Sequence, residues 1–484
     1  MPTRKPAVRK PASRQANRPQ SAGAPAKSTK VRMYRQGLGD CFLVTLPTDG
    51  DQPYYVVIDC GVILGTQDAT NKMQAVVDDI AKTTNSHVNL LIATHEHWDH
   101  LSGFLQATDL FGKIQFDNVW LGWTEDPADT LAGKLKAEHQ AMRVALQAAC
   151  ARMRAAGRQG SDTESFLEFF GAAGSGTTGD ALQIVKGLKP PRFCTPSDAP
   201  VLLDGTQVTA YVLGPPHDEQ MIKRYNPSKA HPETYGLALD DLQSVFCDED
   251  RVAPFDPLFK IPYEVAKQMP FFGSRYWGEA AGTQESPAPA ATLTCHPTGN
   301  DGHGESSKRT ITAELDQSWR RIDDAWLDAS SGMALQLDSA TNNTSLVVAF
   351  ELNNKDVLLF AADAQVGNWL SWQGLKWKRN GDEVTGPDLL QRTVLYKVGH
   401  HGSHNATLRE EGLELMGKLR IALIPVDHAM AVKKRWGQMP LEQLESRLND
   451  KTGGRVLRVD KPIPQPLATS VTDGGGQLYY EVVL

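Results

Sequence analysis

Three imidazoles and two carboxylates lie within one six-residue segment of the chain, HEHWDH at positions 95–100. Neutral imidazole and carboxylate groups are the ligands of zinc and similar metals. The segment comes just after the apolar run 88–93, so we expect it on a turn at the end of a strand, where side chains can converge on one point. His95 and His97 are then expected to hold one ion, and Asp99 and His100 a second. A polar loop with satisfied histidines is the alternative, which the density of ligands disfavours.

Further metal-compatible residues occur at or just past the ends of other apolar runs. They are Asp363, His217, His400 and His401. In α/β folds, sites assemble at the carboxyl ends of the strands, so these side chains are expected near the first cluster. An ionised carboxylate at the end of a buried strand needs a strong partner. Asp363 is therefore expected to bridge two metal ions.

The elements that must position these residues are short apolar, β-branched runs at both ends of the chain. Strands are expected at 31–36, 41–46, 54–59, 88–93, 207–214, 345–352, 356–363, 393–401 and 420–427, followed by a closing hairpin. With helices expected at 70–84 and 440–449, this order predicts a mixed α/β fold with covering helices. Two stretches interrupt the pattern: 104–200, where helical spacing predicts a long amphipathic helix, and the irregular 218–335.

Composition describes an ordinary globular chain of 484 residues, 40% hydrophobic and 22% charged. No stretch approaches the ~18–20 apolar residues of a membrane span. The six cysteines lie too far apart for a disulfide scaffold or a zinc finger, so a reducing, cytoplasmic setting is expected. The segment 295–304, which holds Cys295, His296 and His303, fits no metal-binding module and is expected to be a loop.

The first 30 residues carry eight basic and no acidic side chains, whereas the whole chain has a net charge of −7. Residues 31–484 therefore carry −15. Five prolines and no aromatic residue predict a disordered basic tail over 1–30. A solvated tail is the first interpretation, and a tether to nucleic acid or to an anionic surface is the alternative.

Together these motifs resemble the metallo-β-lactamase-fold hydrolase superfamily, and within it the soluble hydrolase domain of ComEC-type DNA-uptake proteins. HEHWDH matches the signature His-x-His-x-Asp-His in full, and VVIDCG (56–61) matches the strand-Asp-x-Gly element that precedes it. The ComEC-type likeness adds QGLGD (36–40), NNTSLVVAF (342–350), LLFAAD (358–363) and KVGHHGS (397–403). It covers roughly 31–103, 205–217 and 340–484, and not the insertions. Ala362 stands where the family often has glycine.

The resemblance implies a four-layered α/β/β/α sandwich over residues 31–484, with insertions at about 104–200 and 218–335. It also implies two divalent metal ions at the edge of the sandwich, with zinc as the first expectation and manganese or iron as alternatives. The implied ligands are His95, His97, Asp99, His100, Asp363 and one of the pair His400 and His401. His217 stays open between the third histidine of the first metal and a loop histidine.

Three nearby residues are given supporting roles. Asp59 is expected to orient a ligand histidine, because ligating imidazoles usually donate their other N–H to a carboxylate. Capping of its strand is the alternative. Lys397 and Ser403 flank the histidine pair and are expected either to contact an anionic oxygen or to serve packing.

These residues predict a metal-dependent hydrolase. Metal coordination lowers the pKa of water from about 15.7 towards about 7, and Asp99 or His100 is expected to transfer a proton. A phosphoester, either a small molecule or nucleic acid, is the expected substrate, since a two-cation site suits an anionic group and the ComEC-type likeness implies the same. A lactone, thioester or β-lactam hydrolase is one alternative. A non-catalytic, metal-stabilised protein that binds partners is the other.

Overall fold

The computed structural model describes residues 28–155, 170, 176–228, 233–235, 325–379, 381–434, 436 and 439–484. The basic tail up to residue 27, the segment 295–304 and most of the stretch 218–335 lie outside the described residues. The chain divides into two compact units, Met1–Gly236 with Leu327–Leu484, and Leu237–Trp326. Every described strand belongs to the first unit.

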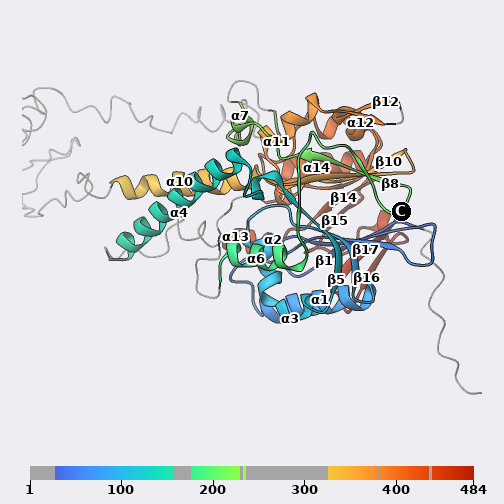
Figure 1. The fold of residues 1–484 in the computed structure, drawn as a ribbon, viewed down its shortest axis with the longest axis horizontal. Coiled ribbons are helices and arrows are strands. Elements are labelled where there is room, and N and C mark those ends of the chain that lie inside the picture. Colours follow the sequence, from blue (N-terminus) through green and yellow to red (C-terminus); the bar gives the residue numbers. More distant parts are fainter. Residues whose placement is uncertain are drawn as a thin grey trace, which may run out of the picture. The chain divides into compact units, whose positions relative to one another are not determined.

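Two large mixed sheets form the centre of the first unit (Figure 1). The first has eight strands in the order β16-β17-β1-β2-β3-β4-β5-β6: β1 (Lys30–Tyr34), β2 (Cys41–Leu46), β3 (Tyr54–Cys60), β4 (His87–Ile92), β5 (Gln115–Gly122), β6 (Arg192–Cys194), β16 (Val471–Gly474) and β17 (Tyr479–Val483). The second has seven strands in the order β15-β14-β13-β10-β9-β8-β7: β7 (Val201–Leu202), β8 (Val208–Gly214), β9 (Val347–Leu352), β10 (Asp356–Phe360), β13 (Thr393–Lys397), β14 (Ile421–Ile424) and β15 (Val456–Arg458). A small separate sheet pairs β11 (Lys376–Arg379) with β12 (Asp382–Thr385).

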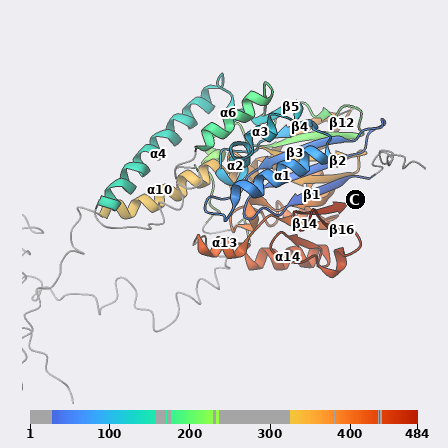
Figure 2. The same cartoon turned by 90° about the horizontal axis from the view of Figure 1, so that it is seen from below.

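Helices cover the outer face of each sheet, so the order of layers is helices, sheet, sheet, helices. The described α-helices are α1 (Ala69–Thr83), α2 (Trp98–Gln106), α3 (Thr108–Phe111), α4 (Thr130–Ala155), α6 (Thr178–Leu188), α7 (Glu219–Ile222), α10 (Ala325–Asn342), α11 (Val366–Ser371), α12 (Gly386–Gln391), α13 (His428–Lys433) and α14 (Glu442–Thr452). In Figure 2, α1, α2 and α3 lie on one side of the strands and α13 and α14 on the other. The expected fold class, α/β with two mixed sheets between helical layers, is confirmed.

The alternation of side chains along the strands builds these layers. In β2, Phe42 and Val44 point between the sheets, where they join Phe350 and Leu358 of the second sheet in one buried cluster. Leu43 points the other way, into the cluster beneath α1 and α2. Because both faces of each sheet are covered, the strands have continuous apolar sequences instead of alternating ones.

The stretch 104–200, expected as an insertion, contributes two strands to the first sheet. β5 pairs in parallel with β4, and β6 pairs in parallel with β5. The long helix expected in this stretch is α4. It lies beside α10 (Figures 1 and 2), and Leu146 of α4 shares a buried cluster with Leu337 of α10. α10 therefore packs on α4 before the chain enters β9.

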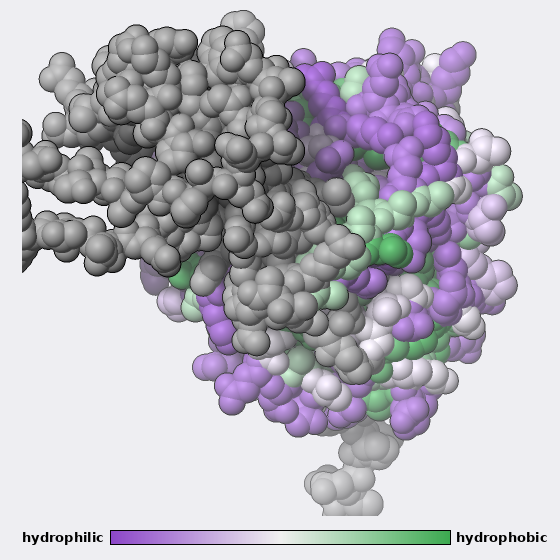
Figure 3. Space-filling model, turned by 90° about the vertical axis from the view of Figure 1, so that its left-hand side faces the viewer, coloured by the Kyte–Doolittle hydropathy of each residue, from purple (hydrophilic) through white to green (hydrophobic). Residues whose placement is uncertain are grey.

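On the face shown in Figure 3, hydrophilic residues predominate among the coloured atoms. Among the described residues, no helix combines the length and the apolar character needed to cross a bilayer.

Candidate metal centre

The expected motifs meet at one edge of the two sheets. β3 and β4 run parallel in the first sheet, and β10 and β13 run parallel in the second. At their carboxyl ends lie Asp59, the segment 95–100, Asp363 and the pair His400–His401. A backbone hydrogen bond of 2.9 Å from Leu346 N to Thr94 O joins the two sheets at this edge.

Six side chains gather there into two overlapping groups. The groups are Asp99, His100, Asp363 and His401, and Asp40, Asp59 and His100; each is buried, and within each group one potential ligand atom per residue lies within 4.8 Å of the others. His100 Nε2 lies 3.2 Å from Asp363 Oδ2, and His401 Nε2 lies 3.1 Å from Asp99 Oδ2. The fold thus brings residues that are 302 positions apart into coordinating reach of one another.

Hydrogen bonds decide which ring nitrogen of each imidazole faces the centre. His401 Nδ1 donates to Pro425 O at 2.9 Å, since a carbonyl oxygen only accepts. His100 Nδ1 donates in the same way to Asp59 Oδ2 at 2.8 Å. Both rings therefore turn Nε2 towards Asp363. A ligating histidine is normally anchored through its outer nitrogen in this manner.

His95 and His97 form the neighbouring half of the centre. Thr94 Oγ1 gives its one proton to Asp59 Oδ2 at 2.7 Å, so it accepts from His95 Nδ1 at 3.1 Å. His95 Nε2 then faces His97 Nδ1 at 3.1 Å. Two nitrogen ligands of one tetrahedral zinc ion, each at about 2.05 Å, would lie about 3.3 Å apart. The two nitrogens are therefore spaced to share a cation.

Lys397 is a buried cation beside the carboxylates. Its Nζ lies 2.6 Å from Asp40 Oδ2 and 3.2 Å from Asp363 Oδ1, and it donates to Ala362 O at 2.8 Å. Burial would lower the pKa of Lys397, but the two carboxylates outweigh burial and raise this pKa above its usual value. The charged amine holds Asp363 Oδ1 and leaves Oδ2 facing the imidazoles.

Opposing charges set the protonation of the centre. Burial would raise the pKa of Asp363, but the positive charge of His100 and its neighbours holds this pKa well below the usual range. Burial lowers the pKa of His97 to about 3 and that of His95 well below its usual value. Burial would also lower the pKa of His100, but Asp363 and the other carboxylates raise it well above its usual value. Near pH 7 the first three groups have the protonation that metal binding requires, and a cation would displace a proton from His100.

Unsatisfied oxygen atoms show that the donor set fits a cation. Within the described parts of the chain, no hydrogen-bond donor reaches Asp99 Oδ1 or Asp40 Oδ1, and both atoms are buried. A buried polar group without a partner costs about 1–3 kcal/mol, and more if it is charged. A divalent cation, or water polarised by one, would offset this cost.

Close backbone approaches hold the Asp99–His100 peptide in place. Asp40 N donates to Asp99 O at 3.0 Å, so the QGLGD turn supports the first turn of α2. Gly61 leaves no room for a side chain, since a Cβ there would lie 2.4 Å from Asp99 C. The glycine of the DCG motif is thus required by the packing of β3 against the segment 95–100.

Replacing Gly61 by alanine is expected to push the Asp99–His100 peptide away from Asp363 and to lower the number of bound cations. Metal content after dialysis, measured by atomic emission, checks this. Gly133→Ala in α4 is the matched control, because a Cβ there meets nothing within 4 Å. A Gly61→Ala variant that binds as much metal as the control would contradict the role of this close packing.

Four of the ten described residues other than glycine that have positive φ lie at the centre. Asp59, Ala362, His400 and His401 all have positive φ, of 54°, 46°, 43° and 51°. Such conformations cost of order 1–3 kcal/mol for residues other than glycine and cluster at functional sites. At Ala362 the positive φ gives a physical reason for the glycine that the resembled family often has there.

The structure separates the two members of the His400–His401 pair. His401 faces the carboxylates, whereas His400 Nε2 lies 3.3 Å from Asn342 Nδ2. Burial lowers the pKa of His400 to about 4, so its ring is neutral near pH 7. The sequence left open which of the two histidines would be the ligand, and this geometry favours His401.

The structure does not bring His217 into the centre. Its ring is about half-exposed, bonds Asp129 Oδ2 at 2.7 Å and packs on Trp123 with 4.2 Å between ring centroids and 43° between the ring planes. Trp123 Nε1 donates to Pro215 O, which holds the loop after β8 in this position. A role for His217 as a metal ligand stays a prediction that this geometry does not favour.

Two carboxylates at the centre were given no role from the sequence. Asp40 lies in QGLGD, so its motif was visible but its contact with Lys397 was not. Asp338 comes from α10, and no motif marks it. Asp338 is 5% exposed, and burial, with Asp99 and Asp363 nearby, raises its pKa well above the usual range.

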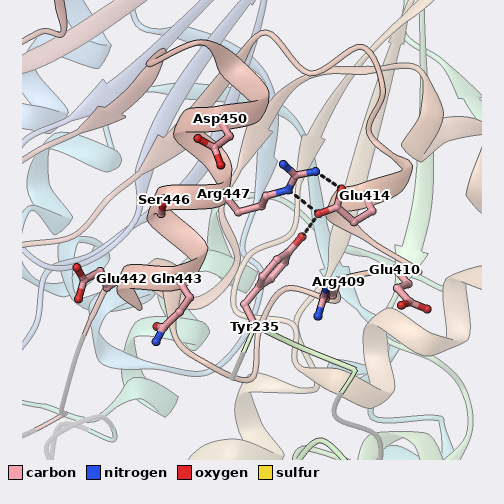
Figure 4. Close-up of a pocket in the computed structure, with 9 residues that line it drawn as sticks. All are labelled: Tyr235, Arg409, Glu410, Glu414, Glu442, Gln443, Ser446, Arg447 and Asp450. Atoms are coloured by element: carbon pink, nitrogen blue, oxygen red, sulfur yellow. Dashed lines mark hydrogen bonds and ion pairs between the residues drawn. The ribbon is translucent and has the colours of Figure 1, made fainter. Parts of the chain in front are cut away.

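The described surface has at least three hollows, of about 260, 410 and 820 Å³. The hollow of about 260 Å³ adjoins the centre, and Glu96 and Phe170 are among the residues that line it. The ring centroids of Phe170 and His97 lie 5.3 Å apart. The hollow of about 820 Å³ is shown in Figure 4. There Glu414 accepts from Tyr235 and Arg447, and these bonds, Arg447 first, lower its pKa to about 2. The linings of the two larger hollows contain no histidine or cysteine, so the hollow of about 260 Å³, which adjoins the centre, is the candidate substrate site.

A scan against protein-family models finds no match to the chain, and a search of curated proteins finds no relative. What the structure establishes is a buried His/Asp cluster in an α/β fold, arranged so that it could hold metal ions.

Proposed function

We propose that this chain is a metal-dependent hydrolase of the metallo-β-lactamase superfamily that holds two divalent cations. His95 and His97 would hold one cation, and Asp363 would lie between it and the second. The remaining ligands of the second would be Asp99, His100 and His401. The observation that carries the proposal is the convergence of four buried ligand side chains, from three separate strand ends, within 4.8 Å.

A bound cation pair would supply an activated water near pH 7 and would neutralise charge on a substrate oxygen. The protein's own groups would prepare the site for this. Lys397 fixes one oxygen of Asp363, and Asp59 and Pro425 O fix the two imidazoles beside it. Asp99 Oδ1 is buried and has no donor among the described residues, so it is the proposed acceptor for a proton of the attacking water.

The hollow beside the centre favours an anionic substrate, and we propose a phosphoester. Lys136, Arg143 and Lys186 line it together with the carboxylates of Glu96 and Glu125. Glu125 forms ion pairs with both lysines, at 2.8 Å from Lys136 Nζ and 3.3 Å from Lys186 Nζ. Glu96 forms an ion pair with Arg143 at 3.3 Å. Three cations against two carboxylates leave a positive excess, in a chain whose net charge is negative. Such a local excess attracts anionic groups.

Metal analysis followed by ester assays tests the proposal. The purified chain is expected to bind up to two equivalents of zinc, manganese or iron and to hydrolyse bis(p-nitrophenyl) phosphate. A chelator should abolish the hydrolysis, and added metal should restore it. Lactone and thioester substrates are assayed in parallel, and faster turnover of these would replace the phosphoester assignment. Failure to bind metal, or hydrolysis that persists in chelator, would contradict the proposed function itself.

A further inference from the structure

Helix α10 brings a carboxylate to the centre from outside the recognised motifs. Asp338 lies one turn before the end of α10, and its Oδ2 accepts from Asn342 Nδ2 at 3.2 Å. Its other oxygen, Oδ1, lies 3.8 Å from His97 Nε2. Asp338 is only 5% exposed, and among the described residues no hydrogen-bond donor reaches its Oδ1. Burying a carboxylate oxygen without a hydrogen-bond partner is unfavourable in free energy, so we expect a partner for this oxygen.

The other imidazoles of the centre show what that partner is. Each holds an acceptor at the ring nitrogen that faces away from the cluster: Thr94 Oγ1 at His95, Asp59 at His100 and Pro425 O at His401. His97 turns Nδ1 towards His95 Nε2, so its outward nitrogen is Nε2. Asp338 Oδ1 lies on that side. Asp338 Oδ1 lies 3.8 Å from His97 Nε2, and Asp59 Oδ2 lies 2.8 Å from His100 Nδ1. The two carboxylates therefore take corresponding positions beside their histidines.

We infer that Asp338 is a positioning residue for His97, which deepens and rests on the proposed metal-dependent function. When a cation binds between His95 Nε2 and His97 Nδ1, the neutral His97 ring must carry its proton on Nε2. Asp338 Oδ1 accepts this proton in a hydrogen bond, which fixes the tautomer and makes Nδ1 a better donor to the metal. α10 would thereby adjust the first cation site, to which the segment after β4 supplies His95 and His97.

Direct coordination by Asp338 is a different arrangement. It would require the cation to lie on the Nε2 side of His97, away from His95 Nε2. The 3.1 Å separation between His95 Nε2 and His97 Nδ1 favours the other side. The two arrangements differ in the number of cations that remain bound when the carboxylate is removed.

Cobalt(II) titration of Asp338→Asn tests the inference without relying on turnover. Asparagine keeps the size of the side chain and a carbonyl oxygen for Asn342, but turns an amide N–H donor, in place of a carboxylate oxygen, towards His97 Nε2. We expect one of two cobalt ions to bind 10–100-fold more weakly, as for other outer partners of ligating histidines, with a shifted d–d absorption band. The other ion should bind as before. The metal-free variant should unfold at the same or a higher temperature, because a buried carboxylate has been replaced by a neutral amide.

Two further variants separate the outcomes. Asp129→Asn removes a carboxylate from the exposed His217 pair and should leave both affinities unchanged. Asp363→Asn should abolish tight binding, and if it does not, the proposed function has failed. Suppose that Asp363→Asn abolishes tight binding while Asp338→Asn binds both ions with unchanged affinity. The inference about Asp338 is then overturned, and the proposed function stands. Complete loss of one ion would assign Asp338 as a ligand, and a lower unfolding temperature of the metal-free Asp338→Asn protein would assign it a structural role; either overturns the inference.

Discussion

Replacing Asp363 by asparagine is expected to lower kcat/KM for phosphodiester hydrolysis at least about 10³-fold, because several kcal/mol of metal-dependent stabilisation is lost. Asp363 Oδ2 faces both His100 and His401, at 3.2 and 3.5 Å, and Lys397 holds its other oxygen. An amide lacks the negative charge that the proposed position between two cations requires, and it cannot both accept from Lys397 and offer a second oxygen to the imidazole side. Steady-state kinetics and metal content on the same samples check the prediction.

Asp356→Asn is the matched control, since Asp356 begins the same strand, β10, and pairs there with the exposed Arg420 at 3.3 Å. It should retain activity and metal. If Asp363→Asn retains both as fully as Asp356→Asn does, Asp363 has no part in the centre and the two-cation arrangement is wrong.

Replacing Lys397 by methionine is expected to lower the free energy of unfolding of the metal-free protein by about 3–5 kcal/mol, the cost of breaking a buried ion pair by removing one partner. The side chain of Lys397 is 1% exposed and contacts both Asp40 and Asp363. Methionine fills a similar volume but leaves these two carboxylates facing each other without a cation. Urea unfolding in the presence of chelator measures the loss.

Lys451→Met provides the comparison, because Lys451 is also largely buried but pairs with Glu414 at 3.4 Å, outside the centre. We expect a loss of about 1 kcal/mol or less there. Zinc should recover more stability in Lys397→Met than in the unchanged protein, since a cation would face the carboxylates that lost their lysine. Equal losses in the two lysine variants would show that Lys397 does not balance the charge of the centre.

Much of the fold could be predicted because the interactions that define its strands are local. Runs such as 41–46 and 54–59 are apolar on both faces and fall at β2 and β3, since each sheet is covered on both sides. The position of β5 and β6 could not be predicted in the same way. Their pairing with β4 is non-local, and 104–200 has no motif that marks it as part of the sheet.

The sequence by itself determined the chemistry of the centre: imidazoles and carboxylates at the ends of apolar strands, with His95, His97, Asp99 and His100 placed together by their spacing alone. Tertiary structure decided which distant groups join them. It turned His401, anchored at Pro425 O, towards the carboxylates of the centre, placed His217 against Trp123, and brought Asp338 in on α10. The physical reason is that residues close in sequence are held together by the backbone, whereas these three outcomes depend on how a loop turns and how one helix packs on another.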